Sequence, residues 1–218
     1  MVGGLLFALG AAASCGGSSE NTVPSDAGGA PEAEAAVIEA ASDATVEAEA
    51  AVTCELGAQP TMPAITSAVV IQGVDGGAAA PVATGGDETG LWVYTKITLY
   101  LPSQAAGQVD PAESKIDGKG FIALGAGKFR QLVDTTTVLS TSIVGKVTRA
   151  GSTKALGTYV KTDATAKLTV ECRESIGETN TLGDVGFSRV DATHGTLHLT
   201  TTSQIGTANL VVDLEKVQ

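Results

Sequence analysis

Residues 90–101 read GLWVYTKITLYL, and their apolar side chains recur at every second position. These apolar positions are Leu91, Val93, Ile97, Leu99 and Leu101. Successive side chains of a β-strand point to opposite faces of a sheet, so the pattern predicts a strand with one buried face. It also predicts that Trp92, Tyr94 and Tyr100 lie together on the other face.

The same alternation continues toward the C-terminus, in residues 167–173, 196–200 and 210–215. Turn-forming Gly, Asn and Asp residues separate the apolar stretches, and no helical spacing interrupts them. We count roughly nine strands between residues 91 and 217. A series of antiparallel strands leaves unpaired edges, and closing the sheet on itself removes them. The sequence therefore predicts an all-β domain, an antiparallel up-and-down barrel of roughly eight to ten strands.

The N-terminus holds a short apolar stretch, residues 5–13, that leads through small residues into Cys15. Its length is that of the apolar part of a signal peptide and falls short of the ~18 residues of a membrane span. Ala12-Ala13-Ser14-Cys15 resembles the lipobox of bacterial lipoproteins, whose signal peptide is cut before a cysteine that is then lipidated. The resemblance implies a signal peptide over residues 1–14 and a lipid on Cys15. The alternative is an ordinary cleaved signal peptide, in which Cys15 has no role.

Residues 15–60 differ from the rest of the chain in charge. Eight of the 24 acidic residues lie between residues 16 and 53, where there is no Lys or Arg. On a helix over residues 31–52, Glu39, Asp43 and Glu47 would repel one another at i,i+4 spacing. We therefore favour a disordered acidic tether. The predicted organisation is a signal peptide over residues 1–14, a tether over 15–60 and a barrel domain over 61–218.

The remaining cysteines, Cys54 and Cys172, form an even pair once Cys15 carries lipid. Export places them in an oxidising compartment, where a structural disulfide is the usual state. We therefore predict a Cys54–Cys172 disulfide, with Cys172 on the inward face of its strand beside Leu168 and Val170. The alternative is two unpaired buried thiols.

Gly90-Leu91-Trp92 resembles the Gly-x-Trp motif at the start of the first lipocalin strand. The stretches GTLHLTT, residues 195–201, and NLVVDLEK, residues 209–216, are similar to the closing strands of lipocalin-like lipoproteins from Gram-negative bacteria. The resemblance implies a barrel with an apolar mouth, in which Gly90 and Trp92 pack at the closed end. It also implies that a basic residue, Lys216 or Arg189, stacks on Trp92.

No pattern in the sequence indicates catalysis, and we expect no enzyme, no catalytic residue, no metal site and no cofactor. His194 and His198, the two histidines, would lie ~13 Å apart on one strand, too far to share a metal ion. Lys and Arg residues are scattered singly, which argues against a nucleic-acid partner. The sequence gives no indication of the oligomeric state.

Two functions fit these patterns. The first is a lipoprotein, anchored to the periplasmic face or the cell surface of a Gram-negative envelope, whose barrel binds a small apolar ligand. Small residues such as Gly118, Gly120, Gly145 and Gly157 would leave space inside. The second is a structural or adhesive envelope module with a filled barrel, for which Trp92, Tyr94 and Tyr100 would form an exposed contact stripe. The candidate ligand contacts are the inward positions Val93, Ile97, Leu99, Leu168, Val170, Leu197, Leu199, Val212 and Leu214, which a filled core would also need.

Overall fold

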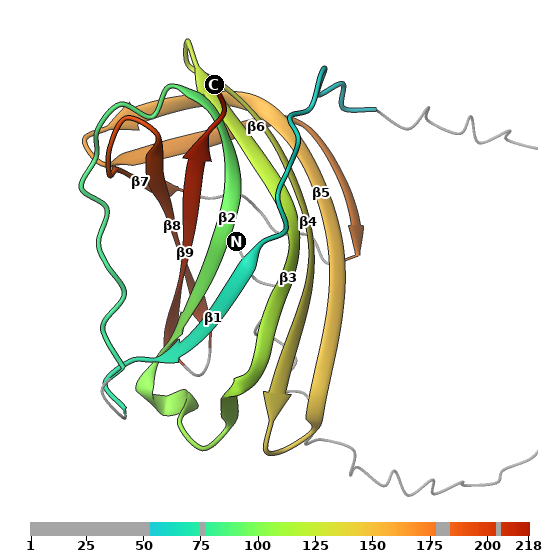
Figure 1. The fold of residues 1–218 in the computed structure, drawn as a ribbon, viewed down its shortest axis with the longest axis vertical. Helices are drawn as coiled ribbons and strands as arrows, with labels where there is room; N and C mark the ends of the chain where they lie inside the picture. The colour runs from blue at the N-terminus through green and yellow to red at the C-terminus, as the bar shows by residue number, and fades with distance from the viewer. Residues whose placement is uncertain (1–52, 75–76, 178–183, 204–205) are drawn as a thin grey trace, which may run out of the picture. The chain divides into compact units, whose positions relative to one another are not determined.

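The computed structural model describes residues 53–74, 77–177, 184–203 and 206–218, and in them the chain is all-β (Figure 1). The strands are β1 (Thr66–Ile71), β2 (Gly90–Leu101), β3 (Val109–Gly125), β4 (Lys128–Thr141), β5 (Gly145–Thr162), β6 (Thr165–Gly177), β7 (Val185–Arg189), β8 (His194–Ser203) and β9 (Gly206–Lys216). One short 3-10 helix, η2 (Ser103–Ala105), joins β2 to β3. A helix able to span a membrane is not found in this described part of the chain.

The nine strands form one sheet in which each strand pairs with the next along the chain. The first long strand, β2, also pairs with β9 over Trp92 to Tyr100, and this pairing closes β2 to β9 into a ring of eight strands. All pairs within the ring are antiparallel. The prediction of an all-β fold of consecutive antiparallel strands is confirmed.

Pairing around the ring is uneven. Strands β3 to β6 are joined by long ladders, whereas β6 meets β7 only through Thr165 with Gly186 and Ala166 with Val185. Residues 167–177 of β6 therefore have no strand partner on the β7 side among the described residues. The ring is closed near the start of β6 and opens between β6 and β7 farther along.

The first strand, β1, lies parallel to β2 and was missed by a strand count that began at residue 91. It pairs with residues 96–101 of β2, while residues 90–93 of β2 pair with β3. On its other side, the backbone N–H of Ile65 donates to the Gly118 carbonyl (2.8 Å) and Ser67 Oγ accepts from the Ile116 N–H (2.8 Å). Thus β1 fills the space where β2 and β3 diverge (Figure 1).

A bulge at Thr95 exchanges the inward and outward positions along β2. The register with β9 shifts between Tyr94 and Lys96, so one extra residue is inserted and the following side chains change faces. Trp92 (0% exposed) and Tyr94 (2% exposed) consequently lie in the inner core together with Ile97. The predicted exposed face containing Trp92 and Tyr94 is therefore wrong, and so is the inward position of Val93, which packs in a separate cluster with Phe121.

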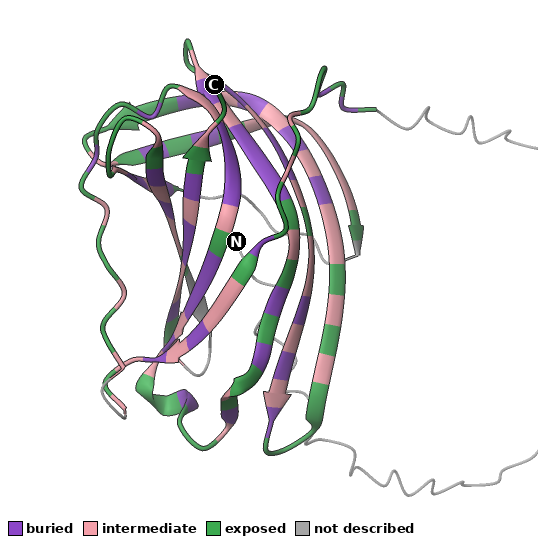
Figure 2. Ribbon diagram, in the orientation of Figure 1, coloured by how far each residue is buried: buried purple, intermediate pink, exposed green. Residues whose placement is uncertain are grey.

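That separate cluster lies on the outer face, beneath the segment of residues 53–62, which we call the N-terminal strap. Leu56 of the strap is buried against Val93 and Phe121. The Arg130 guanidinium donates to the carbonyls of Leu56 and Ala58 and lies 5.8 Å from the centre of the Phe121 ring. Residues 53–60 were assigned to the tether, so the predicted boundary at residue 61 falls inside packed structure. Figure 2 shows the alternation of buried and exposed residues along the strands.

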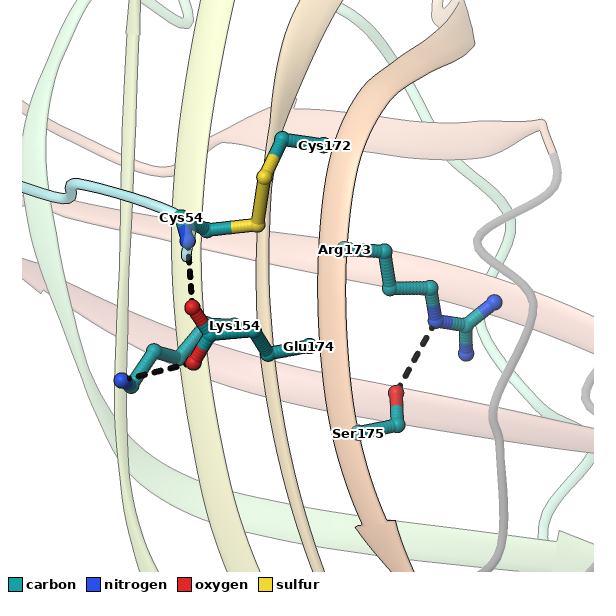
Figure 3. Close-up of a disulfide and its surroundings, with 6 residues drawn as sticks. All are labelled: Cys54, Lys154, Cys172, Arg173, Glu174 and Ser175. Carbon is teal, nitrogen blue, oxygen red and sulfur yellow. Dashed lines mark hydrogen bonds and ion pairs between the residues drawn. A yellow bond between two sulfur atoms is a disulfide. The ribbon is translucent and has the colours of Figure 1, made fainter. Parts of the chain in front are cut away.

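The predicted disulfide is present and joins Cys54 of the strap to Cys172 of β6. A second bulge, at Glu171, interrupts the register between β5 and β6 and moves Cys172 to the outer face. The predicted inward position of Cys172 beside Leu168 and Val170 is therefore wrong. Figure 3 shows Cys172 and Glu174 on one side of β6 and Arg173 and Ser175 on the other. The disulfide thus fastens the strap to the outside of the ring.

Candidate functional site

The predicted ligand contacts divide into three groups. Six are buried in the inner core at 9% exposure or less: Ile97, Leu99, Leu168, Leu197, Val212 and Leu214. Two, Val170 and Leu199, pack against that core but are only partly buried. Val93 is on the outer face. Most of the predicted residues therefore belong to packed interior, and the accessible part of the inner face lies elsewhere.

Trp92 occupies the packed end of the ring. Its indole Nε1 donates to the Glu88 carbonyl (2.8 Å), and Phe187 meets the ring edge-on with centroids 5.8 Å apart. Both candidate bases approach the ring: the Arg189 guanidinium lies 5.0 Å and the Lys216 Nζ 5.4 Å from its centre. Cation–π contacts of this kind contribute about 0.5–2 kcal/mol each. A Cβ at Gly90 would crowd the Lys216 side chain, so a glycine there makes room for that lysine.

A buried carboxylate completes this end. Glu88 accepts hydrogen bonds from the Tyr159 hydroxyl (3.1 Å) and from Lys161. Burial works to raise the pKa of Glu88, but the bonds from Lys161, its own backbone and Tyr159 outweigh it, and the net pKa lies below the ordinary value. Burial and the neighbouring Glu88 raise the pKa of Tyr159 to about 12. The cavity beside these groups measures only about 10 Å³, at most the space of a single water, so no ligand fits at this end.

Comparison with models of known protein families and with curated proteins finds no match for this chain. Function is therefore inferred from the geometry of the chain itself. The described residues contain no group of three or more His, Cys, Asp or Glu side chains placed to hold a metal ion.

The inner face of the ring is half-exposed away from Trp92. Inward residues of β4, β5 and β6 in this region are only partly buried: Val133, Val147, Arg149, Val170, Arg173 and Ser175. Three of them belong to the part of β6 that has no strand partner on the β7 side, and the others lie on the neighbouring strands β4 and β5. On β8 and β9, across the ring in Figure 1, the inward Leu199 and Leu210 are also partly buried. We call this region the open half of the ring.

A polar group stands within the open half and the adjoining core. Tyr94 accepts a hydrogen bond from Gln131 Nε2 (2.6 Å), and burial raises the pKa of the Tyr94 phenol well above its usual value. Arg173 Nε donates to Ser175 Oγ (3.0 Å), which lies 3.4 Å from Thr153 Oγ1. Among the described residues, two buried side-chain atoms have no hydrogen-bond partner: Gln131 Oε1 and Arg173 Nη2.

Sequence reasoning missed Arg173 and Gln131. Arg173 stood in the alternation as an outward residue beside an inward Cys172, and the bulge at Glu171 exchanges the two faces.

The empty volume predicted beside four strand glycines is mostly occupied by neighbouring atoms. A Cβ at Gly120 would lie 2.6 Å from the Tyr94 ring, and Cβ atoms at Gly118 and Gly157 would collide with backbone atoms of neighbouring strands. These three glycines therefore allow close approach and do not leave empty volume. A Cβ at Gly145 would meet no atom within 4 Å.

A second hollow, of about 540 Å³, lies beneath residues 80–83, with His198 and Val211 in its wall. His198 joins these residues to β8: Nδ1 lies 3.2 Å from the Pro81 carbonyl oxygen and Nε2 lies 2.8 Å from Thr196 Oγ1. Burial lowers the pKa of His198, which favours the neutral ring. His194, by contrast, is exposed and bonds to Asp191 in the turn before β8.

Proposed function

We propose that this protein is a lipid-anchored binding protein of the bacterial envelope, whose ring is a lipocalin-like barrel that holds a small, mostly apolar ligand. The observation that carries the proposal is the division of the inner face into a filled end around Trp92 and an open half. A ring with one closed end and an accessible apolar wall can enclose one small molecule.

The lipocalin-like type is supported at the filled end. The first ring strand begins with Gly90-Leu91-Trp92, and both Arg189 and Lys216, from the ends of β7 and β9, lie over the indole. This arrangement matches the expectation drawn from the Gly-x-Trp resemblance.

The envelope location is supported by the disulfide, because such bonds persist in oxidising compartments. Cys15 itself lies outside the described residues. A flexible chain from Cys15 to Cys54 would span ~35 Å on average, enough to hold the ring clear of lipid headgroups. Changing Cys15→Ser should move the protein from the membrane fraction to the soluble one. Retention of the variant in salt-washed membranes would contradict the anchor.

The alternative, an adhesive module acting through its outer surface, loses its main support. Its contact stripe required Trp92 and Tyr94 on the outside, and both are buried inside the ring. Tyr100 alone of the three is partly exposed.

The test of ligand binding is a titration of the full-length Cys15→Ser protein with N-phenyl-1-naphthylamine, a neutral apolar dye that fluoresces when it leaves water. We expect saturable uptake of one dye molecule per chain. Fluorescence that rises without saturation, or does not rise, would contradict the binding function.

A further inference from the structure

The inner face carries a guanidinium and an amide on either side of a small residue. In the paired register, Gln131 of β4 faces Ala155 of β5, and Ala155 faces Arg173 of β6. Ala155 is fully buried and offers only a methyl group, so the two long side chains flank it on the inner face. Neighbouring strands are ~4.8 Å apart, so the backbones of β4 and β6 lie ~10 Å apart on either side of β5.

Arg173 is charged and incompletely paired. Its Nε donates to Ser175 Oγ, whereas Nη2 is buried and has no partner within the part of the chain that the structure describes. No carboxylate among the described residues lies within ion-pair distance of this guanidinium. Arginine stays protonated in proteins, and a charge that is partly removed from water without a counter-charge is unfavourable. The inner face therefore holds a positive charge that a bound anion would neutralise.

The neighbours of Arg173 can serve the same anion. Ser175 places a hydroxyl next to the guanidinium, and the Thr153 hydroxyl lies 3.4 Å from that of Ser175. A half-turn of the Gln131 amide would let Tyr94 donate to its oxygen and would free the amide NH₂ to donate to another group. The half-buried Val133 and Val170 adjoin this group on β4 and β6 and can cover an apolar chain.

We propose that the ligand is an amphipathic carboxylic acid whose carboxylate is bound by Arg173 and whose apolar chain lies in the open half of the ring. This rests on the proposed binding function and names its ligand class. The guanidinium group of arginine can donate two parallel hydrogen bonds to a carboxylate, and the two charges attract. A neutral alcohol has one oxygen and no charge, so it cannot form this paired contact.

The test compares dodecanoic acid with 1-dodecanol as competitors of N-phenyl-1-naphthylamine on the full-length Cys15→Ser protein. We expect the acid to compete about tenfold more strongly than the alcohol, since hydrogen bonds to a charged group carry that difference. Arg173→Met should remove this preference and leave competition by the alcohol unchanged. Lys167→Met, which removes an exposed charge from the outer face of β6, is the matched control and should keep the preference.

Urea unfolding shows whether Arg173→Met keeps its folded structure, so that a lost preference for the acid is not caused by unfolding. Without ligand, Arg173→Met should unfold at the same or higher urea concentration, because it removes a half-buried charge whose Nη2 has no partner among the described residues. Dodecanoic acid should raise the unfolding midpoint of the Arg173 protein more than that of Arg173→Met, which still binds its apolar chain. Equal competition by acid and alcohol, or a preference that survives Arg173→Met, would overturn the inference while leaving the binding function intact. Failure of the dye itself to bind would overturn the binding function.

Discussion

The phenol ring of Tyr94 on β2 lies against Gly120 on β3, so closely that a Cβ at Gly120 would be 2.6 Å from Tyr94 Cδ2. The contact exists because the bulge at Thr95 leaves the Tyr94 side chain on the inner face, and Gly120 occupies an inward position of β3. Because Gly120 has no side chain, the aromatic ring of Tyr94 on the neighbouring strand β2 can occupy the space beside it.

Gly120→Ala should therefore overpack the inner core. We expect a loss of about 1–3 kcal/mol in the free energy of unfolding, measured by urea denaturation. Gly125→Ala on the same strand is the control, because its Cβ would meet only Thr89 Cγ2 at 3.7 Å, an ordinary contact. Equal effects of the two substitutions would show that Tyr94 does not occupy this position.

The disulfide should contribute more to stability than any single contact of the strap. Replacing Cys54 and Cys172 together by Ala should lower the free energy of unfolding by about 2–5 kcal/mol, since the bridge closes a loop with a sequence separation of 118. Reducing agent should destabilise the wild-type protein by a similar amount and have no effect on the double variant. Two free thiols in the exported protein, found by peptide mapping without reduction, would refute the bond.

Glu88 should make stability depend on acid pH. Its pKa is lower in the folded chain than in the unfolded one, so the unfolded state binds the proton more readily. The contribution is present above the unfolded value of about 4.5 and is lost as the pH falls through the lower, folded value. In urea unfolding series between about pH 3 and about pH 7, Glu88→Gln should flatten the acid decline.

Glu113→Gln, which removes a carboxylate that pairs with Lys146 on the surface, is the control for this series. It should leave the acid decline almost unchanged, because exposed ion pairs contribute little. An acid decline that is the same in Glu88→Gln and in the wild-type protein would contradict the role of the buried carboxylate.

The sequence was sufficient for the strands of the ring and their order, because period-two alternation and turn residues are local properties. The faces were harder to predict. Each bulge inserts one residue, at Thr95 and at Glu171, and a shift of one residue moves every following side chain to the other face. Neither bulge has a distinctive local sequence, so Tyr94 and Arg173 could be placed inside only from the register with neighbouring strands.

The N-terminal strap was missed for a related reason. Residues 53–62 carry little alternation, and their burial depends on Cys172, Arg130 and Phe121, which are distant in sequence. Strand β1 is likewise defined by its partners, because it fills the space between β2 and β3.

The central claim is that the open half of the ring holds a ligand, and blocking that half tests it most directly. Val170 is a half-buried inward residue of β6, whereas Val160 of β5 is 70% exposed. The measurement is the number of N-phenyl-1-naphthylamine molecules bound per chain by the Cys15→Ser protein and by the same protein with Val170→Trp or Val160→Trp. We predict one site in the parent protein and in Val160→Trp, and none in Val170→Trp with its unfolding midpoint retained. Dye binding that Val170→Trp leaves unchanged would contradict the claim and place the site outside the open half.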